Sequence, residues 1–296
     1  MLTIFTTTKK FVGHTAVIQN NAITSWTKLG VPVEIIIFGK IEGEDSKMQN
    51  LSFIEIKEVN SFEGRIPYIN DMFHKASRLA KYDHLCFLNA DIILTSPFIK
   101  TIQCLFSSGM KQYLAVGQRL DFDVTREIDF EDNWIDSFIK ENGEDFKLHP
   151  PMGSDIFIFP KNQYRLGAIP DLLVGRPGWD LWMIYNARRV QIPVIDITNS
   201  YLLYHQNHDY SHKNLQTAIK DDKHNYRFLP NGYEYAFTLE FCNYRIINQK
   251  IVQNFFNGDF NKHFTWQNYF ANNSISTRVK SKLGRFLVKL LYIITR

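Results

Sequence analysis

In the sequence Leu88-Asn89-Ala90-Asp91, the carboxylate of Asp91 comes just after an apolar run that predicts a strand. Ligands of open α/β sheets bind at the carboxyl ends of the strands, where this order of residues would place Asp91. A divalent cation held by one or two carboxylates can neutralise a leaving diphosphate, whose oxygens complete the coordination shell. Asp91 therefore suits a cation site, and Asn89 could hydrogen-bond a ribose or a phosphate. The alternative interpretation is that Asp91 caps the turn after the strand.

Three histidines and an aspartate lie between positions 205 and 212: His205, His208, Asp209 and His212. Imidazole and carboxylate groups at this density are typical of metal ligation or of acid–base catalysis. The cluster directly follows the apolar run 201–204, which predicts a strand, so we favour a functional role. The alternative is a polar loop whose histidines are solvated.

Asp180 lies between two tryptophans at the predicted start of a helix, directly after the loop Gly175-Arg176-Pro177-Gly178. Aromatic walls bind the faces of sugar rings, and the desolvation they cause can raise the pKa of a carboxylate. A base that deprotonates an acceptor hydroxyl benefits from such a shift. In the alternative interpretation, Asp180 is an N-cap residue and Trp179 and Trp182 belong to the core.

Further polar residues stand at the ends of other predicted elements. Arg119 follows a strand and could face a diphosphate. Asp155 precedes a strand and could contact the sugar or act as the base. Thr6 and Thr7 end the first strand, where they could meet a nucleobase and a ribose, and Asn70 opens a helix beside the expected donor site. Taken alone, each of these residues also has a structural explanation.

The elements that must position these residues alternate along the chain. Short apolar runs predict strands, and apolar residues at helical spacing predict helices. We expect strands at 2–7, 33–38, 51–56, 84–88 and 113–116, with helices at 14–29 and 68–81. Beyond them we expect helices near 134–140 and at 180–189, and strands at 155–159, 194–197 and 201–204. This order predicts an α/β fold with a Rossmann-like, mostly parallel sheet and helices on both faces.

Charge and cysteine usage exclude several function classes. The 296 residues carry a formal net charge of +4, but the positive excess belongs to the last 26 residues, which contain no Asp or Glu. The rest of the chain is slightly acidic, so we expect no nucleic-acid partner. The three cysteines have no short spacing, which argues against a disulfide framework or a cysteine zinc site and fits a reducing compartment. We expect neither a secretory signal at the N-terminus nor a membrane-spanning segment.

Together these sequence motifs resemble those of nucleotide-diphospho-sugar transferases of the GT-A fold. Asn89-Ala90-Asp91 is similar to the Asp-x-Asp motif of that family, and the resemblance extends over about residues 2–212. It is carried further by the threonine-rich end of the first strand, Ile66–Phe73, Gly117–Arg119, Gly153–Asp155, Trp179-Asp180 and His205–His208. It is strongest to bacterial enzymes that build surface polysaccharides or lipopolysaccharide.

The resemblance implies a nucleotide-sugar donor and a Mn²⁺ or Mg²⁺ ion. It implies that Asp91 is a metal ligand and that His205 or His208, from a later loop, completes the metal shell. Asn89 departs from the family pattern, because it stands where the motif has its first aspartate. We therefore expect fewer carboxylates on the metal; the alternatives are weaker metal binding or none.

The C-terminal segment has a character of its own. Leucine, phenylalanine and isoleucine residues between 283 and 294 follow helical spacing, and basic residues fall largely on another face. This pattern predicts a basic amphipathic helix at 271–296, appended to a single domain at 1–270. Anionic headgroups would attract such a helix, so we expect peripheral attachment to the cytoplasmic face of the plasma membrane. The alternative is a helix packed on the body or on a partner subunit.

The function that unites these observations is transfer of a sugar from a UDP- or GDP-sugar to a glycan or lipid-linked acceptor. Two alternatives stay open. A sugar nucleotidyltransferase shares the architecture and the metal, but residues 6–10 lack the glycine-rich basic loop expected after its first strand. The other alternative is a catalytically silent glycan-binding or assembly subunit at the membrane. It is kept because Asn89 stands where the motif has its first aspartate.

Overall fold

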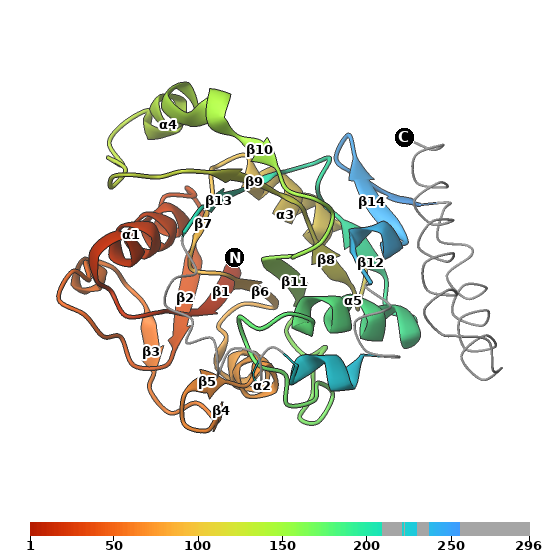
Figure 1. The fold of residues 1–296 in the computed structure, drawn as a ribbon. Helices are drawn as coiled ribbons and strands as arrows, with labels where there is room; N and C mark the ends of the chain where they lie inside the picture. The colour runs from red at the N-terminus through yellow and green to blue at the C-terminus, as the bar shows by residue number, and fades with distance from the viewer. Residues whose placement is uncertain (209–220, 222, 230–236, 255–296) are drawn as a thin grey trace, which may run out of the picture.

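A large twisted sheet forms the centre of the protein, whose structure is a computed structural model that describes residues 1–208, 221, 223–229 and 237–254. Nine strands of the described chain form this sheet (Figure 1). Their order across it is β15 (Lys250–Gln253), β14 (Tyr244–Ile247), β12 (Val194–Asp196), β8 (Leu114–Val116), β11 (Ile156–Pro160), β6 (His84–Leu88), β1 (Leu2–Thr7), β2 (Val33–Phe38) and β3 (Ile54–Ile56). Most neighbours are parallel, whereas β11 is antiparallel to both β6 and β8, and β15 is antiparallel to β14.

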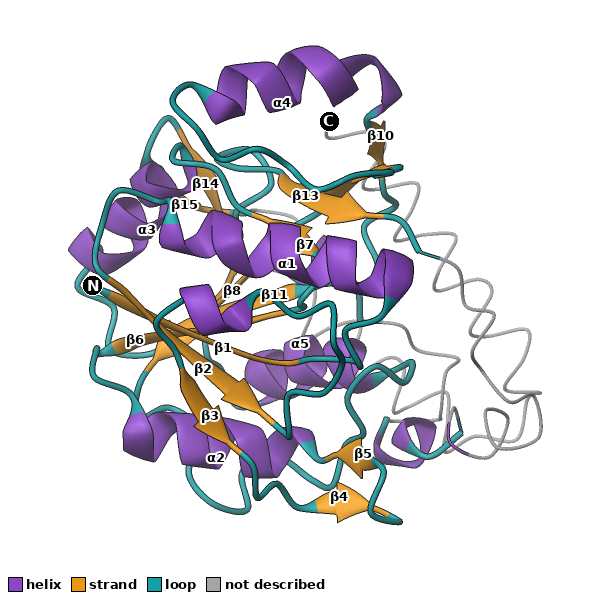
Figure 2. Cartoon of the chain, turned by 90° about the vertical axis from the view of Figure 1, so that its left-hand side faces the viewer, coloured by secondary structure: helices purple, strands orange, loops and turns teal. Residues whose placement is uncertain are grey.

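Helices cover both faces of this sheet. α1 (Gly13–Thr27) and α3 (Phe98–Ser107) lie on one side, and α2 (Ile69–Leu79) and α5 (Trp179–Arg189) on the other (Figure 2). Successive side chains of a strand point to opposite faces, and both faces are buried. Thus Ile4 packs with the α1 and α3 side, while its neighbour Phe5 packs with the α2 and α5 side. The predicted α/β class, with helices on both faces of a mostly parallel sheet, is confirmed.

A second, four-stranded sheet crosses one edge of the molecule. Its order is β10 (Lys147–Leu148), β9 (Arg119–Phe122), β13 (Leu203–Gln206) and β7 (Ile92–Ile93), and α4 (Trp134–Asn142) packs on it. After short links, β7 continues from β6, β9 from β8 and β13 from β12. The small sheet thus gathers the residues that follow three strand ends of the large sheet.

The remaining elements are short. A hairpin pairs β4 (Ser61–Phe62) with β5 (Ile66–Pro67), and 3-10 turns lie at Met48–Asn50, Gly143–Asp145, Asn225–Phe228 and Leu239–Phe241. Within the described part of the chain, no helix has the length and apolar character needed to cross a membrane. The predicted amphipathic helix at 271–296 lies outside the described residues.

Candidate active site

Three predicted metal ligands come together at the junction of the two sheets. Asp91 directly precedes β7, His205 lies in β13, and His208 follows β13. Because β13 pairs with β7 and places His205 opposite Ile92, the imidazole lies beside Asp91. The Nε2 atoms of His208 and His205 are 3.3 and 3.7 Å from Asp91 Oδ2, and ligand atoms of all three residues lie within 4.8 Å of one another.

The environment of Asp91 fits a cation. Its Oδ1 atom is buried and has no hydrogen-bond partner among the described residues, which is a costly state for a carboxylate oxygen unless a positive group meets it. Burial pushes the pKa of Asp91 up, but His205 and His208 outweigh it, so the pKa lies well below its ordinary value. The opposite balance holds at His205, where burial lowers the pKa and Asp91 raises it by more. The contact of Asp91 with the two imidazoles thus favours the ionised form of its carboxylate.

The predicted ligand Asn89 faces another carboxylate. Its Nδ2 atom donates to Asp155 Oδ1 over 2.6 Å, and its backbone N–H donates to the backbone oxygen of Asp155. The other carboxylate oxygen of Asp155 is bound by Arg119 Nη1. Both oxygens of Asp155 are thus engaged, which leaves Asp155 poorly suited to accept a proton from a substrate. The predicted contact of Asn89 with a ribose or phosphate stays a prediction.

Restoring the family's aspartate at position 89 is therefore expected to harm the fold. In an Asn89→Asp variant, two carboxylates would face each other where Asn89 now donates to Asp155, and the oxygen of Asp155 would lose its donor. We expect the free energy of unfolding at pH 7.5, measured in urea, to fall by about 1–3 kcal/mol. Asn89→Ala removes the hydrogen bond without adding charge and should be the milder change. An Asn89→Asp protein more stable than Asn89→Ala would contradict this account.

Asp121, which belongs to none of the sequence motifs, lies at the centre of the polar network. Its Oδ1 atom is 2.9 Å from both Arg119 Nε and His205 Nδ1, and its Oδ2 atom is 2.6 Å from His149 Nδ1. Burial raises the pKa of Asp121, but His149 and Arg119 lower it by more. Arg119 and Asp121 have the two-residue spacing of side chains on one face of a strand, but β9 is only four residues long, too short for this spacing to predict a strand.

Gln206 is a second residue that the sequence did not single out. Its side chain is fully buried, and its Nε2 atom donates to the backbone oxygens of Ile18 and Asp91 over 2.9 and 3.2 Å. Asn21 Nδ2 in turn donates to Gln206 Oε1. These bonds tie Asp91 and β13 to α1, and so they fix the spacing between Asp91 and the histidines on either side of Gln206.

Asp180 lies in the first turn of α5, against the loop that carries Asp155. The backbone N–H groups of Leu181, Asp180 and Ser154 lie close to its carboxylate and lower its pKa. Burial and the charge of Asp155 outweigh these backbone groups and raise the pKa of Asp180 to about 6. A carboxylate with such a pKa is ionised at neutral pH and is a stronger proton acceptor than an ordinary aspartate.

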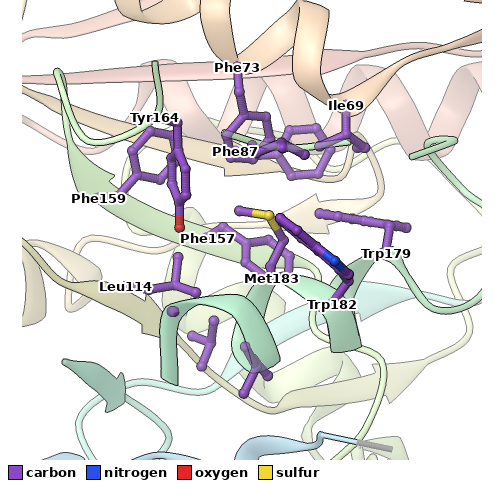
Figure 3. Packing of buried hydrophobic residues seen from close by; sticks show 14 of the residues in the cluster. Ile69, Phe73, Phe87, Leu114, Phe157, Phe159, Tyr164, Trp179, Trp182 and Met183 are labelled. Carbon is purple, nitrogen blue, oxygen red and sulfur yellow. The ribbon is translucent and has the colours of Figure 1, made fainter. Parts of the chain in front are cut away.

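The tryptophans on either side of Asp180 belong to the hydrophobic core. Trp179 packs on Phe87 and Phe157, with ring centroids 5.1 and 4.7 Å apart, and Trp182 lies beside Met183 in the same cluster (Figure 3). Both tryptophans are buried. The expectation that they form the wall of a sugar site is therefore wrong, and the alternative of two core tryptophans is correct. The N-cap of α5 is Gly178 rather than Asp180.

Gly178 sets the path of the chain into α5. It has φ +98°, and a Cβ atom there would lie 3.0 Å from the ring of Tyr226 and 3.3 Å from Leu229. We expect Gly178→Ala to destabilise the fold by at least about 1–2 kcal/mol, because of the left-handed backbone alone. We also expect it to lower activity, since Asp180 lies two residues further on. Thermal unfolding and turnover, compared with Gly167→Ala as a control at positive φ in open space, would measure both effects.

The remaining predicted residues lie outside this network. Thr6 is buried, and its hydroxyl donates to the backbone oxygen of Thr7. Both threonines lie at the end of β1, which neighbours β6 in the sheet. Asn70 donates to Asp171 Oδ1 over 2.7 Å in an exposed position. The nucleotide contacts expected of Thr6, Thr7 and Asn70 stay predictions.

No protein-family model matches the sequence, and no curated protein is significantly similar to it. Among solved structures, the chain is similar to one described as a nucleotide-diphospho-sugar transferase from Desulfovibrio desulfuricans G20, at 11% identity and a TM-score of 0.42, over 67% of this chain and 79% of that chain. It is also similar to S. aureus TarS 1-349 in complex with UDP-GlcNAc, at 12% identity and a TM-score of 0.45, over 77% of this chain and 64% of that chain. A third likeness is to glucosyl-3-phosphoglycerate synthase from Mycobacterium tuberculosis in complex with Mn²⁺, UDP and phosphoglyceric acid, at 12% identity and a TM-score of 0.41, over 75% of each chain.

Proposed function

We propose that this protein is a metal-dependent glycosyltransferase of the GT-A type, which transfers a sugar from a UDP- or GDP-sugar to a glycan or lipid-linked acceptor. The observation that carries the proposal is the convergence of His205 and His208 on Asp91 Oδ2, together with the buried Asp91 Oδ1 atom, which has no hydrogen-bond partner in the described part of the chain. This convergence lies where strands of the large sheet end, which is where α/β proteins bind their ligands.

The ligand set favours Mn²⁺ over Mg²⁺. Two imidazoles and one carboxylate suit a transition-metal ion, whereas Mg²⁺ prefers oxygen ligands and water. Asp91, His205 and His208 would hold the cation, which would neutralise charge on a leaving nucleoside diphosphate.

Asp180 is the base in this proposal, and the reaction inverts the anomeric configuration. Its raised pKa suits it to accept the proton of an acceptor hydroxyl, and Asp155, whose oxygens are both bound, is the less suitable of the two predicted bases. Arg119 was expected to face the diphosphate. Its guanidinium is bound to Asp155 and Asp121, so we assign it the role of holding these carboxylates in place.

The test of the proposed function is hydrolysis of a panel of UDP- and GDP-sugars, because hydrolysis needs no known acceptor. We expect one donor to be hydrolysed with Mn²⁺ present and to be stable after EDTA treatment of the protein. Proton NMR of the released sugar would give its anomeric configuration, and inversion is expected. Binding of no nucleotide sugar, with or without Mn²⁺, would contradict the proposal and favour the silent subunit.

We also propose that the enzyme acts at the cytoplasmic face of the plasma membrane, in the synthesis of a bacterial surface polysaccharide. The proposal is supported by the sequence of residues 271–296. Its apolar residues follow helical spacing, and its basic residues fall largely on another face of the predicted helix. Deleting residues 276–296 should move the protein from the membrane fraction to the soluble fraction of cells. An unchanged membrane fraction would contradict attachment by this segment.

A further inference from the structure

The histidine that faces Asp91 touches a second carboxylate through its other nitrogen. Strand β13 runs parallel to β9, and their register places His205 directly opposite Asp121. His205 Nε2 lies toward Asp91, and His205 Nδ1 lies 2.9 Å from Asp121 Oδ1. The two atoms are within hydrogen-bond distance, although His205 Nδ1 makes no hydrogen bond among the described residues in this ring orientation.

A histidine that binds a metal ion must offer a lone pair on one nitrogen and carry its proton on the other. A carboxylate at the second nitrogen fixes this tautomer and orients the ring, and it also makes the ligating nitrogen more basic. In this structure His205 Nε2 faces Asp91 and His205 Nδ1 faces Asp121. Asp121 lies on the far side of the ring from Asp91, so it acts through His205 rather than as a ligand.

Asp121 is itself held on several sides. Arg119 Nε and His149 Nδ1 contact its two oxygens at 2.9 and 2.6 Å. His149 is fixed in turn, because its backbone N–H donates to Arg119 and its carbonyl oxygen accepts from Gln118 Nε2. A carboxylate with these partners has little freedom to turn away from His205.

We propose that Asp121, on β9, is the positioning carboxylate of the cation site. It provides the second carboxylate near the cation that position 89 does not provide. This inference rests on the proposed function, because it assumes a cation at Asp91, His205 and His208. Asn89 is engaged with Asp155, so the second carboxylate that serves the site comes from β9. The strand order of the small sheet is what brings it there.

The experiment measures Mn²⁺ binding by the full chain after EDTA treatment, from the free Mn²⁺ signal in electron paramagnetic resonance. We expect Asp121→Ala to weaken binding by about 10- to 100-fold. Asp136→Ala removes the same charge from an exposed position on α4 and should leave binding within about twofold of the original, as expected for a distant surface charge. Pulsed resonance of the bound ion should show nitrogen couplings from two histidines in the original protein, and the loss of one in Asp121→Ala. A purely structural role would leave these couplings unchanged.

Each outcome decides between the two proposals. If Asp91→Ala abolishes Mn²⁺ binding while Asp121→Ala binds as tightly as the original with both couplings retained, Asp121 has no positioning role and the cation site stands. If the original protein binds no Mn²⁺, or Asp91→Ala binds it unchanged, the proposed cation site itself is wrong. If Asp121→Ala does not fold, Asp121→Asn replaces it, because asparagine keeps the volume and one acceptor oxygen. The proposal then requires Asp121→Asn to bind Mn²⁺ at least about threefold more weakly than the original protein.

Discussion

Replacing Asp180 by asparagine is expected to lower the turnover number of glycosyl transfer by about 10²- to 10⁴-fold, the usual contribution of a positioned general base. The asparagine keeps the shape of the side chain and an acceptor for the backbone N–H groups of Leu181 and Ser154, so the fold should persist. The KM for the donor should change little, because the proposed cation site does not include Asp180. Steady-state kinetics at pH 8 would measure both constants.

The pH profile provides an independent check on Asp180. Its pKa is raised to about 6, and only the ionised form accepts a proton. We therefore expect kcat/KM to rise with pH up to about 6 and to level off above it, whereas the residual activity of Asp180→Asn should lack this step. An Asp180→Asn enzyme with full turnover, or a product of retained configuration, would remove the assignment of Asp180 as the base.

Stability should move with pH in the opposite direction to activity. A carboxyl whose pKa is higher in the folded than in the unfolded state holds its proton more tightly when folded, so its contribution to stability falls as pH rises from about 4 to about 6 and is constant above that. Asp180→Asn has no such group at this position. The variant should therefore gain in unfolding free energy relative to the original protein between pH 4 and pH 7. Asp136→Asn, at an exposed position, is the control that should show no such gain.

The large sheet could be predicted from the sequence because its strands are continuous apolar runs with clear limits. The bounds Leu2–Thr7, Val33–Phe38 and His84–Leu88 agree with the predicted ones. In the second of these, Pro32 and Gly39 mark the ends. Buried parallel strands are apolar on both faces, so their limits are visible without knowledge of their neighbours.

The small sheet could not be predicted in the same way, and it is what assembles the site. Its strands are two to four residues long, which is too short for a periodic signal. The predicted strand at 201–204 was observed at Leu203–Gln206, so His205 lies within a strand instead of a loop. Asp91, Asp121 and His205 were therefore visible as polar residues, but their pairing depends on contacts between distant parts of the chain. The role of Asp121 became apparent only from the register of β9 and β13.

Removing the carboxylate of Asp91 is expected to lower activity about as much as replacing Asp180. An Asp91→Ala variant leaves His205 and His208 without the acidic partner they share. Charge stabilisation by a bound cation contributes several kcal/mol to the transition state, and a loss of about 4 kcal/mol corresponds to about a 10³-fold fall in kcat/KM. Hydrolysis of the preferred nucleotide sugar would measure this fall.

A thermal readout separates metal binding from catalysis at Asp91. A ligand that binds only the folded state raises the temperature of unfolding, so Mn²⁺ should raise the Tm of the original protein and leave that of Asp91→Ala unchanged. Asp91→Asn is the informative companion, because it keeps an oxygen at the site but loses the charge, and it should show a smaller rise than the original. Asp180→Asn should retain the full rise, since Asp180 is outside the cation site. If Mn²⁺ stabilised Asp91→Ala as strongly as the original, the cation would have to bind elsewhere, and the buried Oδ1 atom of Asp91 would need another explanation.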